Sequence, residues 1–166
     1  RWETQRPPVV VRPLGEWEPN NAVWGQNYPL EYESYMRTRI TDTKTKYGGS
    51  YPRDYLDIDP QEVILFAGYG FSKDYLQARG HYFAVEDVTK TARLIRPFNA
   101  GTCWSCKSTD VPRLMNQMGV KEFYASNFYD LTGEVTHPIG CQDCHDPQTL
   151  KLRITRPALK EAFEAM

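Results

Sequence analysis

The clearest pattern of apolar and polar positions predicts a helix from about Phe83 to Arg96. Four apolar residues follow one another at spacings of three and four and therefore share one face of this helix: Val85, Val88, Ala92 and Ile95. Pro97 ends the pattern, because the residue before a proline avoids the helical conformation. Arg93 lies well away from the apolar face, which by itself indicates an arginine in contact with solvent.

Weaker signals predict further helices over 30–40, 103–119 and 157–166, and one that begins at Pro60 and ends near Gly68 or Gly70. The start at Pro60 is well marked. Asp59 can cap it, proline fits the first helical position, and Glu62 can reach back as in a capping box.

Prolines, glycines and polar residues predict long irregular segments between these helices. They cover 41–57 and 124–139, together with residues 1–21, which contain four prolines. We therefore expect an extended N-terminal arm over 1–21 and one mainly α-helical domain with little β-structure over 22–166. The last helix runs to the end of the chain without a C-cap, so we expect this domain to be truncated at its C-terminus.

Composition narrows the function classes. Apolar residues make up 40% of the 166, which permits a buried core. The net charge of −1 argues against a nucleic-acid partner, which would require an excess of basic residues. The best apolar run, 63–67, is far too short to cross a membrane, and no signal peptide is recognisable.

The four cysteines form two close pairs, of which the second is the stronger signal. Cys141-Gln142-Asp143-Cys144-His145 is a Cys-x-x-Cys-His motif. Two thiols three positions apart on a helical turn reach the two vinyl groups of one haem, and the following histidine supplies an imidazole ligand to the iron. A small disulfide loop or half of a zinc site are the alternatives.

The first pair, Cys103-Trp104-Ser105-Cys106-Lys107, repeats the pattern with lysine in place of histidine. A structural zinc module built from all four cysteines is its main rival. Zinc ribbons usually hold their two pairs about 15–20 residues apart. Here residues 107–140 intervene, and zinc would leave His145 unexplained.

Binding of Lys107 to iron would cost free energy. An ammonium group has no lone pair, so the lysine must lose its proton to become a ligand in a desolvated site. A purely structural role is a poor reason for such a cost. A lysine ligand changes the electronics of the iron, and substrate can bind if the opposite face stays open.

The Cys103–Lys107 motif resembles the active-site haem motif of the ammonium-forming cytochrome c nitrite reductases. Other segments are also similar to this family: 63–69 with 71–75, 79–81 with 83–88, and 140–145. In order and spacing the resemblance covers roughly residues 24–160. It implies a mainly α, multihaem cytochrome c fold in which haem faces and aromatic side chains form much of the core, in agreement with the 13% aromatic content.

The resemblance also implies roles for single residues. Cys103 and Cys106 would hold the catalytic haem c with Lys107 as its axial ligand, and Arg93 would be the catalytic arginine that attracts nitrite. A second haem c, held by Cys141 and Cys144 and ligated by His145, would pass electrons. His81 would be the distal ligand of a further haem. His137 lies beside Pro138 in a predicted turn, where we expect a surface histidine.

The family carries five haem motifs where this chain has two, and its calcium ligands lie beyond residue 166. The resemblance therefore implies part of a periplasmic nitrite reductase whose leader has been removed. The complete protein would be a homodimer fed by a membrane-bound quinol dehydrogenase or a soluble multihaem donor. The runner-up is a non-catalytic dihaem electron-transfer module.

Overall fold

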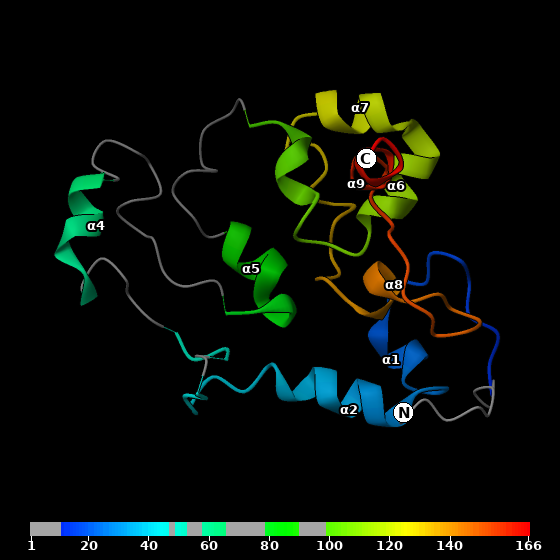
Figure 1. Ribbon diagram of the computed structural model, residues 1–166, viewed down its shortest axis with the longest axis horizontal. Helices are drawn as coiled ribbons and strands as arrows, with labels where there is room; N and C mark the ends of the chain where they lie inside the picture. The colour runs from blue at the N-terminus through cyan, green and yellow to red at the C-terminus, as the bar shows by residue number, and fades with distance from the viewer. Residues whose placement is uncertain (1–10, 47–48, 53–57, 66–78, 90–98) are drawn as a thin grey trace.

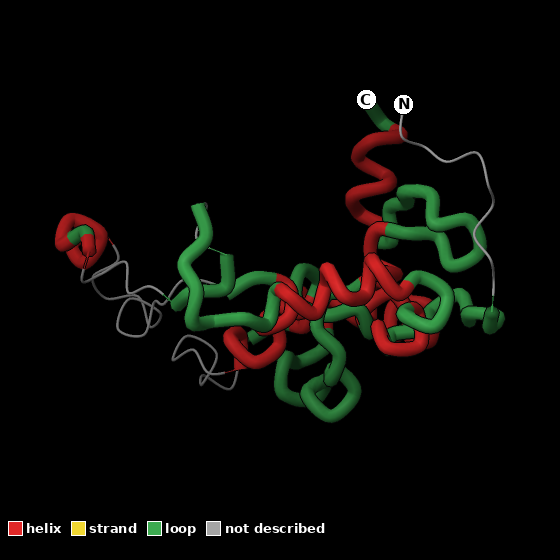
Figure 2. Tube along the Cα trace, turned by 90° about the horizontal axis from the view of Figure 1, so that it is seen from below, coloured by secondary structure: helices red, strands yellow, loops and turns green. Residues whose placement is uncertain are grey.

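The computed structural model describes residues 11–46, 49–52, 58–65, 79–89 and 99–166. Within these ranges the chain is mainly helical and contains no strand, only isolated bridges at Ala100–Asn127, Ser108–Pro138 and His145–Leu152 (Figures 1 and 2). None of the described helices is long and apolar enough to cross a membrane. The elements are α1 (Asn21–Trp24), α2 (Pro29–Arg37), α4 (Pro60–Leu65), η1 (His81–Phe83), α5 (Ala84–Thr89), η3 (Gly101–Trp104), α6 (Val111–Met118), α7 (Val120–Ala125), α8 (Cys141–Cys144) and α9 (Pro157–Glu164).

Several predicted helices are confirmed where the structure describes them. The helix expected over 30–40 is α2, and the helix expected over 157–166 is α9. The start at Pro60 is also confirmed, because Asp59 Oδ1 accepts a hydrogen bond of 3.1 Å from the backbone of Gln61. The predicted end near Gly68 or Gly70 lies outside the described residues. So does the part of the 83–96 helix beyond Thr89.

Two short α-helices, α1 and α7, were not expected. The predicted helix over 103–119 is divided into η3 and α6, and α7 follows directly, so the loop expected from Tyr124 begins only at Ser126. Gly119 separates α6 from α7 with φ 93, a conformation that glycine adopts without a steric cost. Near the N-terminus, Asn20 caps α1 by accepting a hydrogen bond of 2.9 Å from the Ala22 backbone.

The main core joins η3, α6, α7 and the loop that follows α7. Its buried members are Trp104, Val111, Leu114, Met115, Phe123, Phe128, Leu131 and Val135. The rings of Trp104 and Phe128 are stacked with centroids 4.1 Å apart, and Trp104 Nε1 donates to the Phe128 carbonyl at 3.0 Å. Val85 and Val88 pack against this core, as their spacing predicts.

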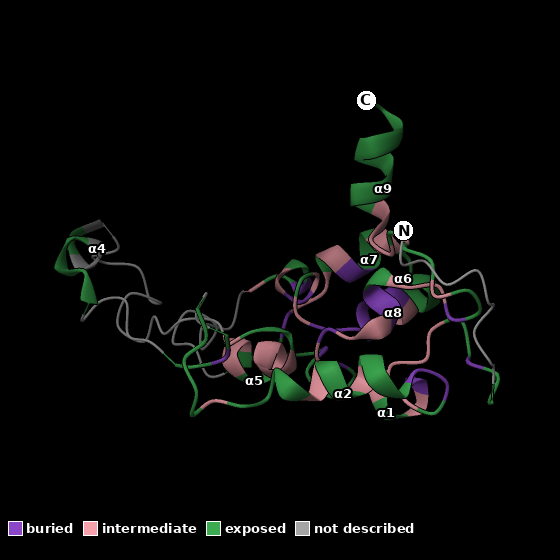
Figure 3. Cartoon of the chain, turned by 60° about the horizontal axis from the view of Figure 1, so that its bottom comes forward, coloured by how far each residue is buried: buried purple, intermediate pink, exposed green. Residues whose placement is uncertain are grey.

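A second, smaller core joins the N-terminal segment to α8. Leu14, Trp24 and Tyr28 are buried there, and Cys141 and Leu150 pack against them. The Asn27 side chain fixes the segment before Leu14. Its Oδ1 accepts hydrogen bonds from the Val11 and Arg12 backbones at 2.9 and 2.8 Å. In Figure 3 the mostly buried helix α8 lies between the N-terminal segment and the main core, and α9 projects away from them.

The main core should dominate the stability of the chain. Replacing Phe128 with alanine removes a ring that is 1% exposed, and the free energy of unfolding should fall by about 3–5 kcal/mol. The same change at Phe163, which is 58% exposed on α9, should cost well under half as much. Urea unfolding of the protein followed by circular dichroism measures both values. Equal losses would contradict this assignment of the core.

Candidate functional site

The second cysteine motif forms the single helical turn α8. Asp143 Oδ2 accepts a hydrogen bond of 2.8 Å from the Gly140 backbone, which closes the start of the turn. Asn21 Oδ1 accepts another of 2.8 Å from the Cys141 backbone. A side chain at position 140 would bring its Cβ within 2.3 Å of Asn21 Oδ1, so the glycine before the motif permits this contact.

His145 directly follows the turn and has a fixed ring orientation. Its Nδ1 lies 2.8 Å from the carbonyl oxygen of Leu150. Because a carbonyl oxygen only accepts, Nδ1 carries a proton, and in the neutral ring the lone pair is therefore on Nε2. This is the tautomer that a metal-ligating histidine requires.

The first motif lies on η3 and the turn that follows it. Gly101 again permits a close approach, because a Cβ there would lie 2.5 Å from the Phe123 carbonyl oxygen. Cys103 is half-buried and Cys106 is exposed. Lys107 is half-buried, and the described residues offer its amine no hydrogen bond or ion pair. The Lys107 amine is therefore not engaged by any other described residue.

All four cysteines are free thiols in the structure. Burial raises the pKa of the Cys141 thiol to about 11, and burial together with Asp143 raises the pKa of the Cys144 thiol. The reactive Cys-x-x-Cys pairs of redox enzymes have lowered pKa values instead. No three histidine, cysteine or acidic side chains gather as metal ligands in the part of the chain that the structure describes. The geometry thus favours neither a redox dithiol nor a four-cysteine zinc site.

Arg156 connects the two motifs. Its guanidinium donates to the Ser105 carbonyl at 2.7 Å and to the Ser108 carbonyl at 2.9 Å, on either side of Cys106 and Lys107. The same group lies 2.7 Å from Asp143 Oδ1, between Cys141 and Cys144. The two motifs therefore hold fixed positions relative to each other.

Gln142, the other residue between the second pair of cysteines, strengthens this connection. It is 1% exposed, and its amide donates to the Thr109 carbonyl, two residues after Lys107. Arg153 donates from Nε to the Gln142 carbonyl at 3.2 Å. Gln142 thus binds the peptide after the first motif directly, and Asp143 is connected to the peptide around that motif through Arg156.

His137 is partly exposed, as a surface histidine should be, and it also contacts a buried carboxylate. Its ring is 40% exposed, and its Nδ1 lies 3.2 Å from Oδ2 of Asp110, a carboxylate that is 2% exposed. The same oxygen accepts hydrogen bonds from the Thr136 and His137 backbones, each at 2.9 Å. Sequence spacing gives no sign of this pair, because 26 residues separate the two side chains in a region without periodicity.

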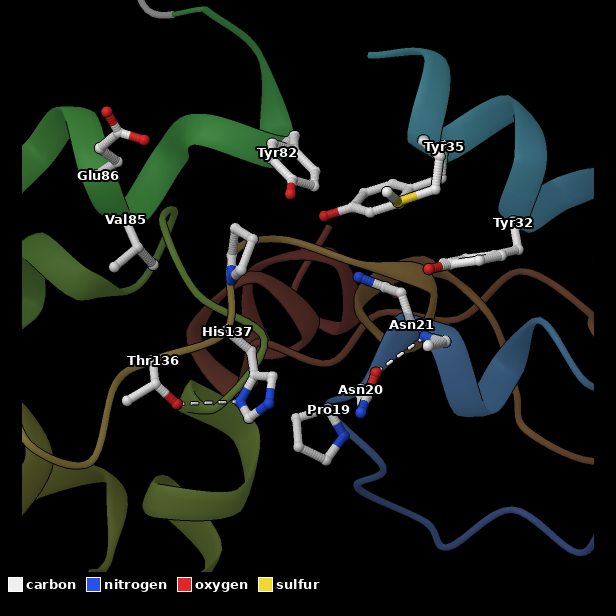
Figure 4. Close-up of a pocket in the computed structure, with 13 residues that line it drawn as sticks. Pro19, Asn20, Asn21, Tyr32, Tyr35, Tyr82, Val85, Glu86, Thr136 and His137 are labelled. Carbon is white, nitrogen blue, oxygen red and sulfur yellow. Dashed lines mark hydrogen bonds between the residues drawn. The ribbon is translucent and has the colours of Figure 1, made fainter. Parts of the chain in front are cut away.

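His137 also lines a pocket of about 430 Å³ between α1, α2, η1 and α5 (Figure 4). The pocket is rich in aromatic side chains: Tyr32, Tyr35 and Tyr82. The Tyr35 hydroxyl points into it, and burial raises the pKa of this group. Asn21, which also lines the pocket, is the residue that binds the Cys141 backbone. A hollow lined partly by three tyrosine side chains therefore lies next to the second motif.

Two further predicted site residues, His81 and Arg93, do not belong to either cysteine motif. His81 begins η1 and is exposed, next to Tyr82 of the pocket. Arg79, just before it, is held by Asp87 at 2.7 Å and Glu86 at 3.0 Å and covers the Phe83 ring. Arg93 lies outside the described residues.

Comparison with known proteins agrees with this geometry. The model of the cytochrome c552 family matches residues 20–166. The chain is 46% identical over 152 residues to a cytochrome c-552 of Bacteroides fragilis and 47% identical over 153 residues to that of Parabacteroides distasonis. These alignments cover 88% and 89% of this chain but only 31% of each relative. The chain thus spans about a third of the length of these curated relatives.

A solved structure supports the fold. The cytochrome c nitrite reductase of Desulfovibrio desulfuricans, a catalytic subunit with two calcium sites, matches 93% of this chain and 36% of its own with a TM-score of 0.79 and 26% identity. The expected fold class, mainly helical and of the multihaem cytochrome c type, is therefore confirmed.

Loss of the Arg156–Asp143 ion pair should strongly destabilise the folded chain. Their side chains are 16% and 6% exposed, so Arg156→Ala leaves an unpaired buried carboxylate and should lower the free energy of unfolding by about 3–5 kcal/mol. The exposed pair Lys160–Glu164 provides the control, and Lys160→Ala should cost about 1 kcal/mol or less. Urea unfolding of both variants measures the difference.

A double variant tests the cause. Adding Asp143→Asn to Arg156→Ala removes the buried charge and should recover part of the lost stability. A further loss instead of a recovery would show that the arginine acts through its contacts with the carbonyls alone.

Proposed function

Because the chain belongs to the cytochrome c552 family, we propose that it forms the part of a cytochrome c nitrite reductase, an enzyme that reduces nitrite to ammonium, that carries the catalytic haem and the next haem. Two haem c groups would attach to this chain. Cys103 and Cys106 would hold the first and Cys141 and Cys144 the second. The observation that carries the proposal is the joint geometry of the two motifs, each a short helical turn with two free thiols followed at once by a residue with an available nitrogen.

The residues present fit haem c. In each motif one cysteine is exposed and one is half-buried, and neither pair is closed by a disulfide. The Nε2 lone pair of His145 and the unengaged amine of Lys107 supply one axial ligand each. When bound, the haem irons would supply a site for nitrite and a path for electrons.

The chain's own residues would then set the reactivity. Lys107 would be held neutral by ligation, and the network of Arg156 fixes the peptide on both sides of it. By its distance before Lys107, Arg93 occupies the place of the family's catalytic arginine. A permanently charged guanidinium there would attract the nitrite anion and stabilise negative charge on its oxygen atoms.

Other properties of the family complete the proposal. His81 would be the distal ligand of a further haem, which agrees with its exposed position and with the absence of a protein partner among the described residues. We also propose a periplasmic location and electron delivery from a membrane-bound quinol dehydrogenase or a soluble multihaem carrier. The complete protein would form a homodimer and bind calcium through ligands that this chain does not contain.

Denaturing mass spectrometry tests haem attachment. After expression in a host that matures c-type cytochromes, the chain should carry the mass of two covalent haems. Replacing Cys141 and Cys144 with serine should remove one haem, and replacing Cys103 and Cys106 should remove the other. The bare polypeptide mass in the unmodified chain would contradict the proposal and leave the zinc module as the alternative.

Substitutions at Lys107 and Arg93 test the catalytic roles in the complete enzyme. Lys107→His should keep the haem, change its reduction potential and lower nitrite turnover. Arg93→Ala should reduce kcat by about 10²–10³-fold with little loss of haem, because it removes charge stabilisation of the transition state. Arg39→Ala, an exposed arginine, is the control and should leave kcat unchanged.

Two outcomes would contradict the catalytic roles of Lys107 and Arg93. Unchanged turnover in Lys107→His would remove any special role for the lysine. Equal losses of haem and turnover in Arg93→Ala would indicate a structural arginine. If nitrite and cyanide also leave the haem spectrum unchanged, both axial positions are filled, and the chain is a dihaem electron-transfer module.

A further inference from the structure

Leu150 has an unusual backbone conformation. Its φ is 58, and it is the one residue other than glycine with a positive φ in the described ranges. Side chains with a Cβ rarely adopt this left-handed conformation because of steric crowding with the backbone. Such positions persist only where surrounding contacts impose them, and they are concentrated at functional sites. The carbonyl of Leu150 is the group that accepts the hydrogen bond from His145 Nδ1 at 2.8 Å.

The loop that contains Leu150 is closed by its own hydrogen bonds. The Leu150 backbone donates to the Asp146 carbonyl at 2.9 Å, and the Asp146 backbone donates to the Lys151 carbonyl at 2.8 Å. Asp146 Oδ1 accepts three more hydrogen bonds, from the Gln148 backbone at 3.0 Å and from the backbone and hydroxyl of Thr149 at 2.8 Å each. The loop therefore presents the Leu150 carbonyl to the histidine ring in a defined position.

The N-terminal segment holds this loop from the outside. The Leu150 side chain packs against the second core of Leu14, Trp24 and Tyr28. Gln148 Nε2 donates to the Leu14 carbonyl at 3.2 Å, and the Tyr28 hydroxyl lies 3.4 Å from the Pro147 carbonyl. This packing compensates for the unfavourable backbone of Leu150 and explains why a leucine occupies a position that suits glycine.

We propose that Leu150 is a positioning residue for the axial histidine: the packing of its side chain on Leu14, Trp24 and Tyr28 holds the left-handed backbone, and the carbonyl placed by that backbone lowers the reduction potential of the second haem. The inference rests on the proposed haem attachment at Cys141 and Cys144. A hydrogen bond from Nδ1–H to a well-placed carbonyl makes the imidazole a more basic ligand. A more basic ligand stabilises the oxidised iron and lowers its potential. Loosening the Leu150 carbonyl should therefore raise the potential.

Three variants of the haem-loaded protein separate positioning from packing. Leu150→Ala removes the side chain that packs on the second core but keeps the Cβ, so the backbone should leave its left-handed conformation and the hydrogen bond should weaken. Leu150→Gly removes the same packing but adopts positive φ without cost, so it should keep the carbonyl in place. Leu152→Ala is the matched control, since Leu152 is 81% exposed in the same segment.

Redox titration followed by electron paramagnetic resonance reports each haem by its own g-values. We expect Leu150→Ala to raise the potential of one low-spin haem by about 30 mV or more and to change its g-values. That shift corresponds to about a threefold change in the ratio of reduced to oxidised haem, at about 59 mV per tenfold for one electron. Leu150→Gly and Leu152→Ala should stay close to the unmodified protein.

The pattern across the variants decides the inference. An unchanged potential in Leu150→Ala, or a shift in Leu150→Gly as large as that in Leu150→Ala, would overturn the positioning role even though both haems are attached. Mass spectrometry of the unmodified protein is run on the same samples. If covalent haem is missing there, the proposed function fails first and this inference fails with it.

Discussion

The position of Arg156 is the constraint on which the two cysteine motifs depend. Within the described ranges the chain has short helices and no sheet, so neither motif is held by a long regular element. The half-buried guanidinium of Arg156 instead binds the carbonyls of Ser105 and Ser108 and the carboxylate of Asp143. Because a guanidinium presents its donors in a rigid planar fork, these contacts fix direction as well as distance. A lysine at position 156 would present a single ammonium group on a flexible stem and could not make the same set of contacts.

The structure uses two separate apolar clusters, and each of them holds one motif. The main core contains Trp104, which lies between the first two cysteines, and the second core contacts Cys141. Each motif also follows a glycine that permits another segment to come close, Phe123 at Gly101 and Asn21 at Gly140. Mutations that alter packing in either core should therefore displace the corresponding cysteine motif, even when they lie far from it along the chain.

Local signals in the sequence were sufficient for part of this picture. The proline start of α4, the apolar face of Val85 and Val88 and both cysteine motifs depend on residues within one or two turns, and spacing alone reveals them. The Asp110–His137 pair and the bridging role of Arg156 could not be predicted, because they join residues from 13 to 51 positions apart with no repeat to relate them. The same holds for Leu150, since a leucine carries no signal for a left-handed backbone.

The contact between Asn21 and Cys141 has a consequence for the order of events during folding. These residues are 120 positions apart, and Tyr28 and Pro147 are 119 apart, so the second motif is closed by contacts between segments that lie far apart in the chain. Contacts of such high sequence separation form late, because a long loop must first be closed. During folding the turn at Cys141–Cys144 therefore exists for some time without its contacts to the N-terminal segment. The two thiols are most accessible in that interval, before the native packing covers part of Cys141.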